Sequence, residues 1–314
     1  MFYNIKEPIL ITGPAGFIGS NLLRKCVDEK LNVNVFLRKS SNTWRIEDIL
    51  DKVQVHNVDL SNTKEVQDKI LRIKPRTIFH LAAYGAYEYQ DEIDNIKQAI
   101  LDATMNLIRA CSITGFNIFV NTGSNSEYGF KRFPMKETDL LTPNSYYAVF
   151  KAASSMFCQY ESISKKLPIV TVRPFHVYGP YEEKTRLIPT LISKFLNNEC
   201  PPLTAPDIAR DMIYVEDVVN FYLFLTNQNI DYGSIFNLGT GAQYSLQEVV
   251  DLTLKLTDSK VKPIWNTMQK RKWDQISWEA DINKVKKFFG WTPINNLENG
   301  LSKTINWYKN HNRN

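Results

Sequence analysis

Short apolar runs alternate with amphipathic segments through the first half of this 314-residue chain. Runs of four to six apolar residues have the length of strands buried on both faces of a sheet. Strands that alternate with helices pair in parallel, and right-handed crossovers place helices on both faces. The pattern therefore predicts an α/β fold, a doubly wound parallel sheet of the Rossmann type. We expect buried strands at 9–12, 33–37, 53–58, 77–81, 117–121 and 169–172, and helices near 17–29, 63–73, 92–114 and 144–165.

The pattern changes after Val172, where six prolines fall between residues 174 and 206. Proline interrupts regular elements, so loops and short elements are expected to dominate there. Beyond this stretch we expect a strand at 234–238 and helices near 215–226, 245–257 and 297–308. The chain is expected to form two parts: residues 1–172, to which 211–240 return, and a smaller C-terminal lobe made mainly of 173–314.

Composition and charge exclude several classes of function. The net charge is +5 and the basic residues are dispersed, so no nucleic-acid patch is predicted. Four widely spaced cysteines form no Cys-x-x-Cys pair, which argues against a zinc site or a disulfide framework. There is no run of about 18 apolar residues and no basic, apolar leader, so neither a membrane span nor a signal peptide is expected. These features are typical of a cytoplasmic protein with reduced thiols that binds no metal, nucleic acid or membrane.

A glycine-rich turn follows the first predicted strand. Its glycines are spaced Gly-x-x-Gly-x-x-Gly, directly after the strand and at the start of the first helix. Glycine lets the backbone approach a pyrophosphate, and the amides and dipole of the following helix favour negative charge. An ordinary strand–helix turn is the alternative, but the position after the first strand favours a dinucleotide site in residues 1–172. The residues expected to hold the pyrophosphate are Gly13, Gly16, Phe17, Ile18 and Gly19.

The end of the second predicted strand indicates which dinucleotide binds. A carboxylate is expected there if the adenosine ribose hydroxyls are recognised, but this chain has Arg38, followed by Lys39 and Ser40. An arginine suits a ribose 2′-phosphate, so NADP(H) is favoured over NAD(H), although a solvated basic loop is an alternative interpretation. Asp59 and Leu60 end the third predicted strand and are expected beside the adenine, where Asp59 would accept from the amino group.

Tyr147 and Lys151 are four residues apart in the helix predicted at 144–165, so they share one helix face. A phenol has an ordinary pKa of about 10, and a nearby cation lowers it, which lets Tyr147 exchange a proton with a hydroxyl group. Lys151 is also suited to hold the nicotinamide ribose. A surface helix pair is the alternative. The polar stretch 121–129, which contains Ser124, favours the catalytic interpretation because it ends a buried strand at the edge where doubly wound sheets bind ligands.

Eight motifs follow one another in the order of a known family over about four-fifths of the chain. They are TGPAGFIGS (12–20), Asp59-Leu60, HLAA (80–83), the serine-rich strand end (122–129), Tyr-x-x-x-Lys (147–151), RPFHVYGP (173–180), RDMIYVEDV (210–218) and FNLGTG (236–241). With these motifs the chain resembles the extended short-chain dehydrogenase/reductase family, in its NAD-dependent epimerase/dehydratase branch. The resemblance implies that Ser124, Tyr147 and Lys151 are catalytic. It also implies cofactor contacts from Leu81, Ala82, Ala83, Pro174 and Tyr178.

The same resemblance implies a nucleotide-diphosphate sugar as substrate, bound mainly by 173–314, and a homodimer formed through a four-helix bundle. Arg210 and Arg271 would grip the diphosphate because arginine offers paired donors, and Asp274 would hold the nucleotide ribose. Surface salt bridges are the alternative role for these arginines. Further substrate contacts are expected from Tyr84, Asn125, Ser126 and His176, the last of which replaces the asparagine usual in that motif.

Departures from the family patterns narrow the reaction. Sugar 4,6-dehydratases carry Asp-Glu directly after the catalytic Ser or Thr, whereas this chain has Asn125-Ser126, which argues against dehydration. No cysteine lies at a strand end, which argues against the epimerase-reductases that make fucose-type sugars. A 4-epimerase with tightly bound NAD and an NADPH-dependent 4-ketoreductase both remain, and a non-catalytic cofactor sensor is a minor alternative. Arg38 favours the reductase, which would act on a nucleotide-linked 4-keto-6-deoxyhexose. The segments 38–46 and 271–282 favour it too, because they resemble those of reductases in the deoxysugar biosynthesis of bacterial surface glycans. The base, the sugar and the product configuration stay open.

Overall fold

The computed structural model describes residues 5–86, 89–131, 133–268 and 277–311. The chain divides into two compact units. The first unit contains Met1–Gly129, Leu140–Arg173 and Val219–Phe236, and the second contains Phe130–Asp139, Pro174–Val218 and Asn237–Asn314. The roles expected for the two parts of the chain, dinucleotide binding and nucleotide-sugar binding, stay predictions.

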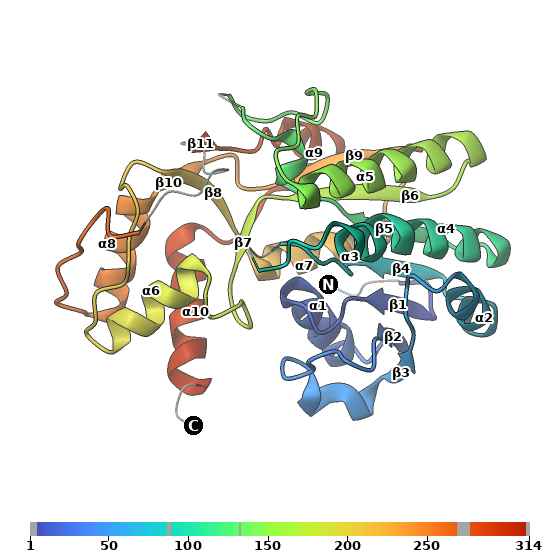
Figure 1. Ribbon diagram of the computed structural model, residues 1–314, viewed down its shortest axis with the longest axis horizontal. Helices are drawn as coiled ribbons and strands as arrows, with labels where there is room; N and C mark the ends of the chain where they lie inside the picture. Colours follow the sequence, from blue (N-terminus) through green and yellow to red (C-terminus); the bar gives the residue numbers. More distant parts are fainter. Residues whose placement is uncertain (1–4, 87–88, 132, 269–276, 312–314) are drawn as a thin grey trace. The chain divides into compact units, whose positions relative to one another are not determined.

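A seven-stranded sheet forms the centre of the first unit, in the order β3-β2-β1-β4-β5-β6-β9 (Figure 1). Its strands are β1 (Ile9–Thr12), β2 (Val33–Leu37), β3 (Gln54–Asn57), β4 (Thr77–His80), β5 (Ile118–Thr122), β6 (Ile169–Pro174) and β9 (Ile235–Leu238). The neighbours from β3 to β6 pair in parallel. This order is that of a doubly wound sheet, so the predicted fold class is confirmed.

Burial differs between the strands of this sheet. Every residue of β1, β2, β4, β5 and β6 is buried, as expected for strands covered on both faces. The prediction of a buried strand at 53–58 was wrong in its burial: β3 lies at one edge of the sheet and three of its four residues are exposed, whereas β9, at the other edge, is buried throughout.

Helices cover both faces of this sheet. Its helical elements are α1 (Phe17–Asp28), η1 (Glu47–Lys52), α2 (Thr63–Ile73), α3 (Ile93–Lys97), the π-helical turn η2 (Gln98–Asp102), α4 (Ala103–Thr114), η3 (Asn125–Tyr128), α5 (Tyr146–Lys165) and α7 (Val215–Leu225). On one face, apolar side chains of α2, α4 and α5 pack with Ile78 of β4 in a single core cluster. On the other face, Tyr222 of α7 stacks on the neighbouring Phe79, with ring centroids 6.4 Å apart. The alternation of side chains along β4 thus separates the two layers.

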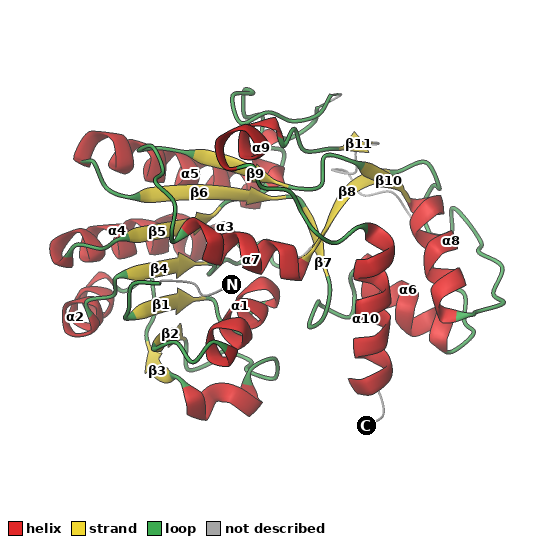
Figure 2. Cartoon of the chain, turned by 180° about the vertical axis from the view of Figure 1, so that it is seen from behind, coloured by secondary structure: helices red, strands yellow, loops and turns green. Residues whose placement is uncertain are grey.

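Among the residues that the structure describes, the second unit contains a smaller sheet and several helices (Figure 2). In the sheet, β8 (Ala209–Tyr214) lies between β10 (Gln243–Ser245) and β11 (Ser277–Trp278), and β7 (His176–Tyr178) also pairs with β8. The helices are α6 (Leu187–Leu196), α8 (Leu246–Thr257), α9 (Asn283–Phe289) and α10 (Leu297–His311). The expectation that short elements dominate after Val172 missed α6, which tolerates Pro189 because a proline in the first turn needs no amide donor.

One buried carboxylate organises this smaller sheet. Asp211 of β8 is fully buried and accepts hydrogen bonds from the backbone amides of Thr240, Gly241 and Ala280. The hydroxyl of Thr240 donates to the same side chain at 2.7 Å. The loop after β9 and the segment after β11 are thereby tied to β8, next to Arg210. None of the helices in the described part of the chain has the length and apolarity needed to cross a membrane.

Candidate cofactor and catalytic site

The turn between β1 and α1 is closely packed at two of its three glycines. Gly13 has a φ of +69°, and a Cβ there would lie 2.7 Å from the backbone nitrogen of Ala82. A Cβ at Gly19 would lie 2.1 Å from the carbonyl oxygen of Gly13. Both positions therefore require glycine if α1 is to begin this close to the strand ends.

The third glycine leaves room for a ligand. A Cβ at Gly16 would meet one atom within 4 Å, the carbonyl oxygen of Gly13 at 3.3 Å. Gly16 precedes α1, and no side chain caps that end of the helix. The first-turn amides of α1, which include those of Phe17 and Ile18, are thus free of side-chain caps and suited to a phosphate.

A cavity of about 460 Å³ lies beside this turn, within the first unit. Its volume is in the range of cofactor pockets. Its walls come from the segments that follow β1, β2, β3 and β4 and from the start of the helix after β4. Of the residues predicted from sequence, those that line it are Gly13, Gly16, Arg38, Ser40, Asp59, Leu60, Leu81, Ala82, Ala83 and Tyr84.

The cavity is more extensive than the sequence indicated. The lining also includes Pro14, Ala15, Phe36, Leu37, Ser41, Asn42, Val58, Ser61, Asn95, Gln98 and Ala99. Asn95 and Gln98 are three residues apart on one helix face, a spacing that could have indicated them. Of the predicted residues, Lys39 is exposed and does not line the cavity.

Two charged side chains, those of Arg38 and Asp59, are among the residues that line the cavity. Arg38 is exposed at the end of β2, and its backbone amide donates to Ser41 Oγ at 3.1 Å. Asp59 is the one carboxylate among the lining residues that the structure describes, and its Oδ1 accepts from the amide and hydroxyl of Ser61. The glycine turn at the start of α1 and a cavity of this size beside it fit an adenine dinucleotide.

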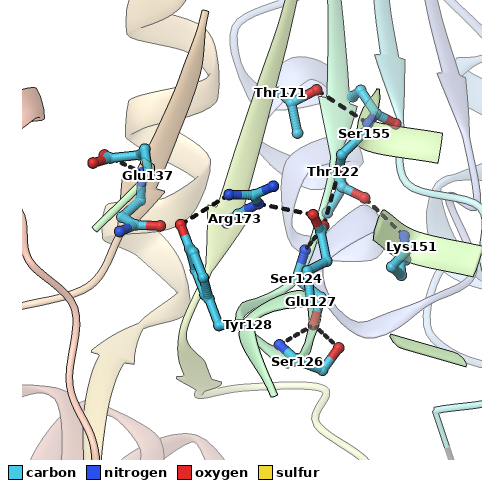
Figure 3. A network of polar contacts seen from close by, with 12 residues as sticks. Thr122, Ser124, Ser126, Glu127, Tyr128, Glu137, Lys151, Ser155, Thr171 and Arg173 are labelled. Carbon is cyan, nitrogen blue, oxygen red and sulfur yellow. Dashed lines mark hydrogen bonds and ion pairs between the residues drawn. The ribbon is translucent and has the colours of Figure 1, made fainter. Parts of the chain in front are cut away.

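The side chain of Lys151, a residue of α5, reaches the end of β5 and lies close to the ring of Tyr147. Its Nζ donates to the carbonyl oxygen of Thr122 at 2.7 Å (Figure 3). The same Nζ lies 5.9 Å from the centroid of the Tyr147 ring. The side chain is 4% exposed, and burial lowers its pKa to about 8. The negative charge of Glu127 acts in the opposite direction. The predicted pair is therefore brought together, with an ammonium near the phenol ring.

The hydroxyl of Ser124 is oriented as a hydrogen-bond donor. Its Oγ accepts from the amide and the hydroxyl of Ser126, at 3.1 and 2.8 Å. Both oxygen lone pairs are then occupied, and no acceptor among the described residues takes its hydrogen. Ser124 can therefore donate to an oxygen of a bound substrate. Asn125 and Ser126 begin η3 and are partly exposed.

Sequence reasoning missed the carboxylate behind this serine. Ser124 and Glu127 form a capping box at η3, in which Ser124 N donates to Glu127 Oε1 at 2.8 Å. Glu127 is fully buried and forms an ion pair with Arg173, with Nε and Oε2 2.8 Å apart. The Ser-x-x-Glu spacing was the signal that could have indicated it.

Four predicted residues lie in the described part of the second unit, which contains Pro174, His176, Tyr178 and Arg210. Tyr178 is buried, and its hydroxyl donates to the carbonyl oxygen of Leu297 at 3.4 Å. Pro174 ends β6, and Arg210 lies in β8. Arg271 and Asp274 lie outside the described residues. The binding roles of all six stay predictions.

His176 is held neutral. Burial lowers its pKa well below the ordinary value, and the charges of Arg210 and Arg186 lower it further. The ring of His176 packs edge to face against that of Trp278, with the ring centroids 6.0 Å apart. Its Nδ1 is buried and has no hydrogen-bond partner among the residues that the structure describes. A neutral imidazole beside two arginines suits an anionic ligand.

Comparison with known proteins adds three findings. The model of the NAD dependent epimerase/dehydratase family matches residues 9–239. YtcB of Bacillus subtilis, described as an uncharacterized UDP-glucose epimerase, is 27% identical over 326 residues, which cover 95% of this chain and 96% of that protein. The solved structure of MoeE5 in complex with UDP-glucuronic acid and NAD superimposes with a TM-score of 0.84 and 28% identity, covering 97% of this chain and 99% of that one.

A longer plant relative is similar over part of its length. The trifunctional UDP-glucose 4,6-dehydratase/UDP-4-keto-6-deoxy-D-glucose 3,5-epimerase/UDP-4-keto-L-rhamnose-reductase RHM1 of Arabidopsis thaliana is 27% identical over 319 residues. The match covers 96% of this chain and 46% of that protein. The chain thus spans about half the length of this relative.

The buried ammonium predicts a pH-dependent stability difference between the wild type and Lys151→Met. The pKa of Lys151 is about 8 in the folded protein against an ordinary 10.5, so between these values the unfolded chain binds one proton more. Stability then rises with pH, and the wild type should gain on the order of 3 kcal/mol relative to Lys151→Met across this range. Urea unfolding of both proteins between pH 7 and 10.5 measures the difference.

The control for this measurement is Lys166→Met, directly after the last residue of the same helix, because Lys166 is exposed. The difference in the free energy of unfolding between this control variant and the wild type should change little with pH. A pH-independent difference for Lys151→Met would contradict the depressed pKa.

Proposed function

Since the chain belongs to the NAD-dependent epimerase/dehydratase family, we propose that it uses NADPH to reduce the C4 keto group of a nucleotide-linked 4-keto-6-deoxyhexose. The choice of a reductase rests on the position of Arg38. Arg38 lines the cavity at the end of β2, where recognition of unphosphorylated ribose hydroxyls would call for a carboxylate. A net reduction consumes reduced cofactor, and an arginine at this position favours the 2′-phosphate of NADPH.

The catalytic groups have complementary roles in this reaction. The reduced nicotinamide, when bound, supplies the hydride that becomes the new C–H bond at C4 of the sugar. Tyr147 donates its phenolic proton to the C4 oxygen, and Ser124 donates a hydrogen bond to the same oxygen. The ammonium of Lys151 near the Tyr147 ring stabilises the phenolate that remains, until solvent returns the proton.

A 4-epimerase with tightly bound NAD is the second candidate. It is favoured by MoeE5, whose solved complex holds NAD, and by YtcB, which is described as a UDP-glucose epimerase. The same three catalytic residues would serve, because oxidation at C4 is the reverse of the reduction. The two functions differ in whether reduced cofactor is consumed.

The contacts of η3 argue against dehydration. Ser126, which follows Asn125 in place of an acid pair, is engaged with Ser124. The nearby carboxylate, Glu127, is fully buried and paired with Arg173, so it cannot exchange a proton with a sugar. Loss of water from a sugar needs its own acid and base, and these residues offer neither.

For the nucleotide sugar, we propose that the second unit supplies the main contacts. His176 and Arg210 would meet the nucleotide diphosphate, together with Arg271 and Asp274. The neutral state of His176 and the two arginines whose charges act on it support an anionic ligand.

An exposed apolar face on α4 and α5 supports a homodimer. The side chains are between 42% and 66% exposed, and those of α5 recur at helical spacing. They are Ile113, Tyr146, Val149, Met156, Tyr160 and Ile163. We propose that a second copy of the chain covers this face in a four-helix bundle.

The reductase proposal predicts stoichiometric loss of NADPH with one member of a panel of nucleotide 4-keto-6-deoxyhexoses, followed by absorbance at about 340 nm. Tyr147→Phe should lower the rate by about 100-fold or more, because the proton donor is removed. Tyr146→Phe, next to it in the helix, is the matched control and should retain activity. A change of C4 configuration in a nucleotide hexose without consumption of reduced cofactor would favour the epimerase instead.

The role of Arg38 predicts a selective effect on cofactor affinity. Arg38→Ala should raise the Kd of NADPH by about 10- to 100-fold, the loss of one or two charge-assisted bonds, and leave that of NADH within about 2-fold. Fluorescence titration with each cofactor measures both constants. Lys39→Ala, a basic neighbour that does not line the cavity, should change neither by more than about 3-fold. Equal losses for both cofactors in Arg38→Ala would mean that the arginine does not recognise the 2′-phosphate.

The proposed dimer predicts a change of mass on disruption of the apolar face. Light scattering after size-exclusion chromatography should give twice the chain mass for the wild type and the chain mass for Tyr160→Glu, because a charge buried without a partner is costly. Ile294→Glu, at a residue 81% exposed in the second unit, is the control and should leave the mass unchanged. A monomeric wild type would overturn the proposal.

A further inference from the structure

Glu127 is a charged group buried directly behind the candidate catalytic residues. Its exposure is 0%, and its two carboxylate oxygens meet three donors from three parts of the first unit (Figure 3). Oε1 accepts from Ser124 N at 2.8 Å and from Ser155 Oγ at 2.9 Å. Oε2 accepts from Arg173 Nε at 2.8 Å.

These contacts require the ionised form of the side chain. All three neighbours donate, and a protonated carboxyl would turn one of its oxygens into a competing donor. Burial raises the pKa of Glu127, and the guanidinium of Arg173 opposes this. Arg173 is 2% exposed and donates through Nη1 to Tyr128 OH at 2.9 Å. Carboxylate and guanidinium thus compensate each other inside the unit.

A single oxygen joins the two elements that carry the candidate catalytic groups. Ser155 lies four residues after Lys151 and eight after Tyr147, so the three share one face of α5. Through Oε1, the backbone of Ser124 and this face of α5 are held against the same atom. The fit is close, since a Cβ at Gly123 would lie 2.6 Å from Oε1.

Glu127 also contributes the negative charge that acts on the buried ammonium. In the described part of the chain, the titratable groups around Lys151 are Tyr147 and Cys158 of α5, His80 of β4, Glu127 of η3 and Tyr222 of α7, whose hydroxyl donates to Thr122. Burial lowers the pKa of His80 to about 3 and raises that of Cys158, so both are neutral at physiological pH. Glu127 is then the carboxylate that favours the protonated form of Lys151.

We propose that Glu127 is a positioning residue for the reaction: without touching the substrate, its carboxylate holds Ser124 and α5 in register and supplies a counter-charge to Lys151. The inference rests on the proposed function in that Lys151 and Ser124 act at C4. It goes beyond that function in assigning a role to an ion pair that otherwise serves stability alone.

The test compares three variants with the wild type. Glu127→Gln removes the charge and keeps the shape. The double variant Glu127→Gln with Arg173→Met removes both charges and keeps an acceptor oxygen for Ser124 N and Ser155 Oγ, so it replaces the single variant if the unpaired charge of Arg173 makes that one too unstable. Ser155→Ala is the matched control, because it removes one donor to Oε1 and leaves every charge in place.

The first readout is the pH profile of kcat/KM with the ketosugar identified for the wild type. The high-pH limb should move to lower pH by about one unit in both charge-removing variants, which is a 10-fold change in proton affinity. We expect kcat to fall by about 10-fold or more, with KM within about 3-fold, because the sugar is not contacted. Ser155→Ala should leave the limb in place. An unchanged limb in both charge-removing variants would overturn the proposal and leave Glu127 a purely structural role.

The second readout does not need turnover. Lys151→Met is introduced into the wild type and into the double variant, and the stability difference is followed by urea unfolding between pH 6 and 10.5. In the double-variant background the difference should begin to change about one pH unit lower, because the folded state releases its proton earlier. If no nucleotide sugar is turned over, the proposed function fails, and this onset decides the role of Glu127 alone. An onset at the same pH in both backgrounds would overturn it.

Discussion

Parallel pairing brings the carboxyl ends of the strands of the first unit to one edge of its sheet. Each of these ends then contributes to the candidate site: the glycine turn after β1, Arg38 after β2, Asp59 after β3, the 81–84 segment after β4 and Ser124 after β5. None of these segments has to be long, because the strands already aim at the same edge. The cavity and the candidate catalytic residues depend on this constraint.

Polar groups beneath this edge are paired by hydrogen bonds. His80, at the end of β4, is buried, and its Nδ1 lies 2.6 Å from Thr12 Oγ1. Its Nε2 lies 3.0 Å from Thr104 Oγ1. Thr104 donates its hydrogen to the carbonyl oxygen of Ile100 at 2.6 Å, so Nε2 of His80 is the ring donor and Nδ1 accepts from Thr12. Burial lowers the pKa of His80 to about 3, which keeps this arrangement in one protonation state. The chain of bonds links β1, β4 and the π-helical turn beside the cavity.

Charge is used differently at the rim and in the interior. Arg38 is exposed and can bind or release an anion at little cost in stability, so it is suited to select a cofactor. Arg173 and Glu127 are buried, where removal of either partner would leave a charge without compensation. Lys151 lies between these extremes, since it is buried but can lose its proton near physiological pH. In the function proposed above, this division separates cofactor recognition by Arg38 from the influence of buried charges on the candidate catalytic residues.

Periodicity and glycine spacing were sufficient to predict the α/β class, the order of elements to β6 and the glycine turn between β1 and α1, because these depend on neighbours in the sequence. The same local signals could not tell that β3 is an edge strand or that α6 tolerates Pro189, since both depend on position in the folded chain. The motif spacing also predicted the pairing of Tyr147 with Lys151, which one helix face determines. Only the tertiary structure decided that Glu127, an ordinary capping residue by spacing, is buried against Arg173 forty-six residues later. Burial depends on how the whole unit packs. Because packing buries Glu127, its carboxylate charge acts on the ammonium of Lys151.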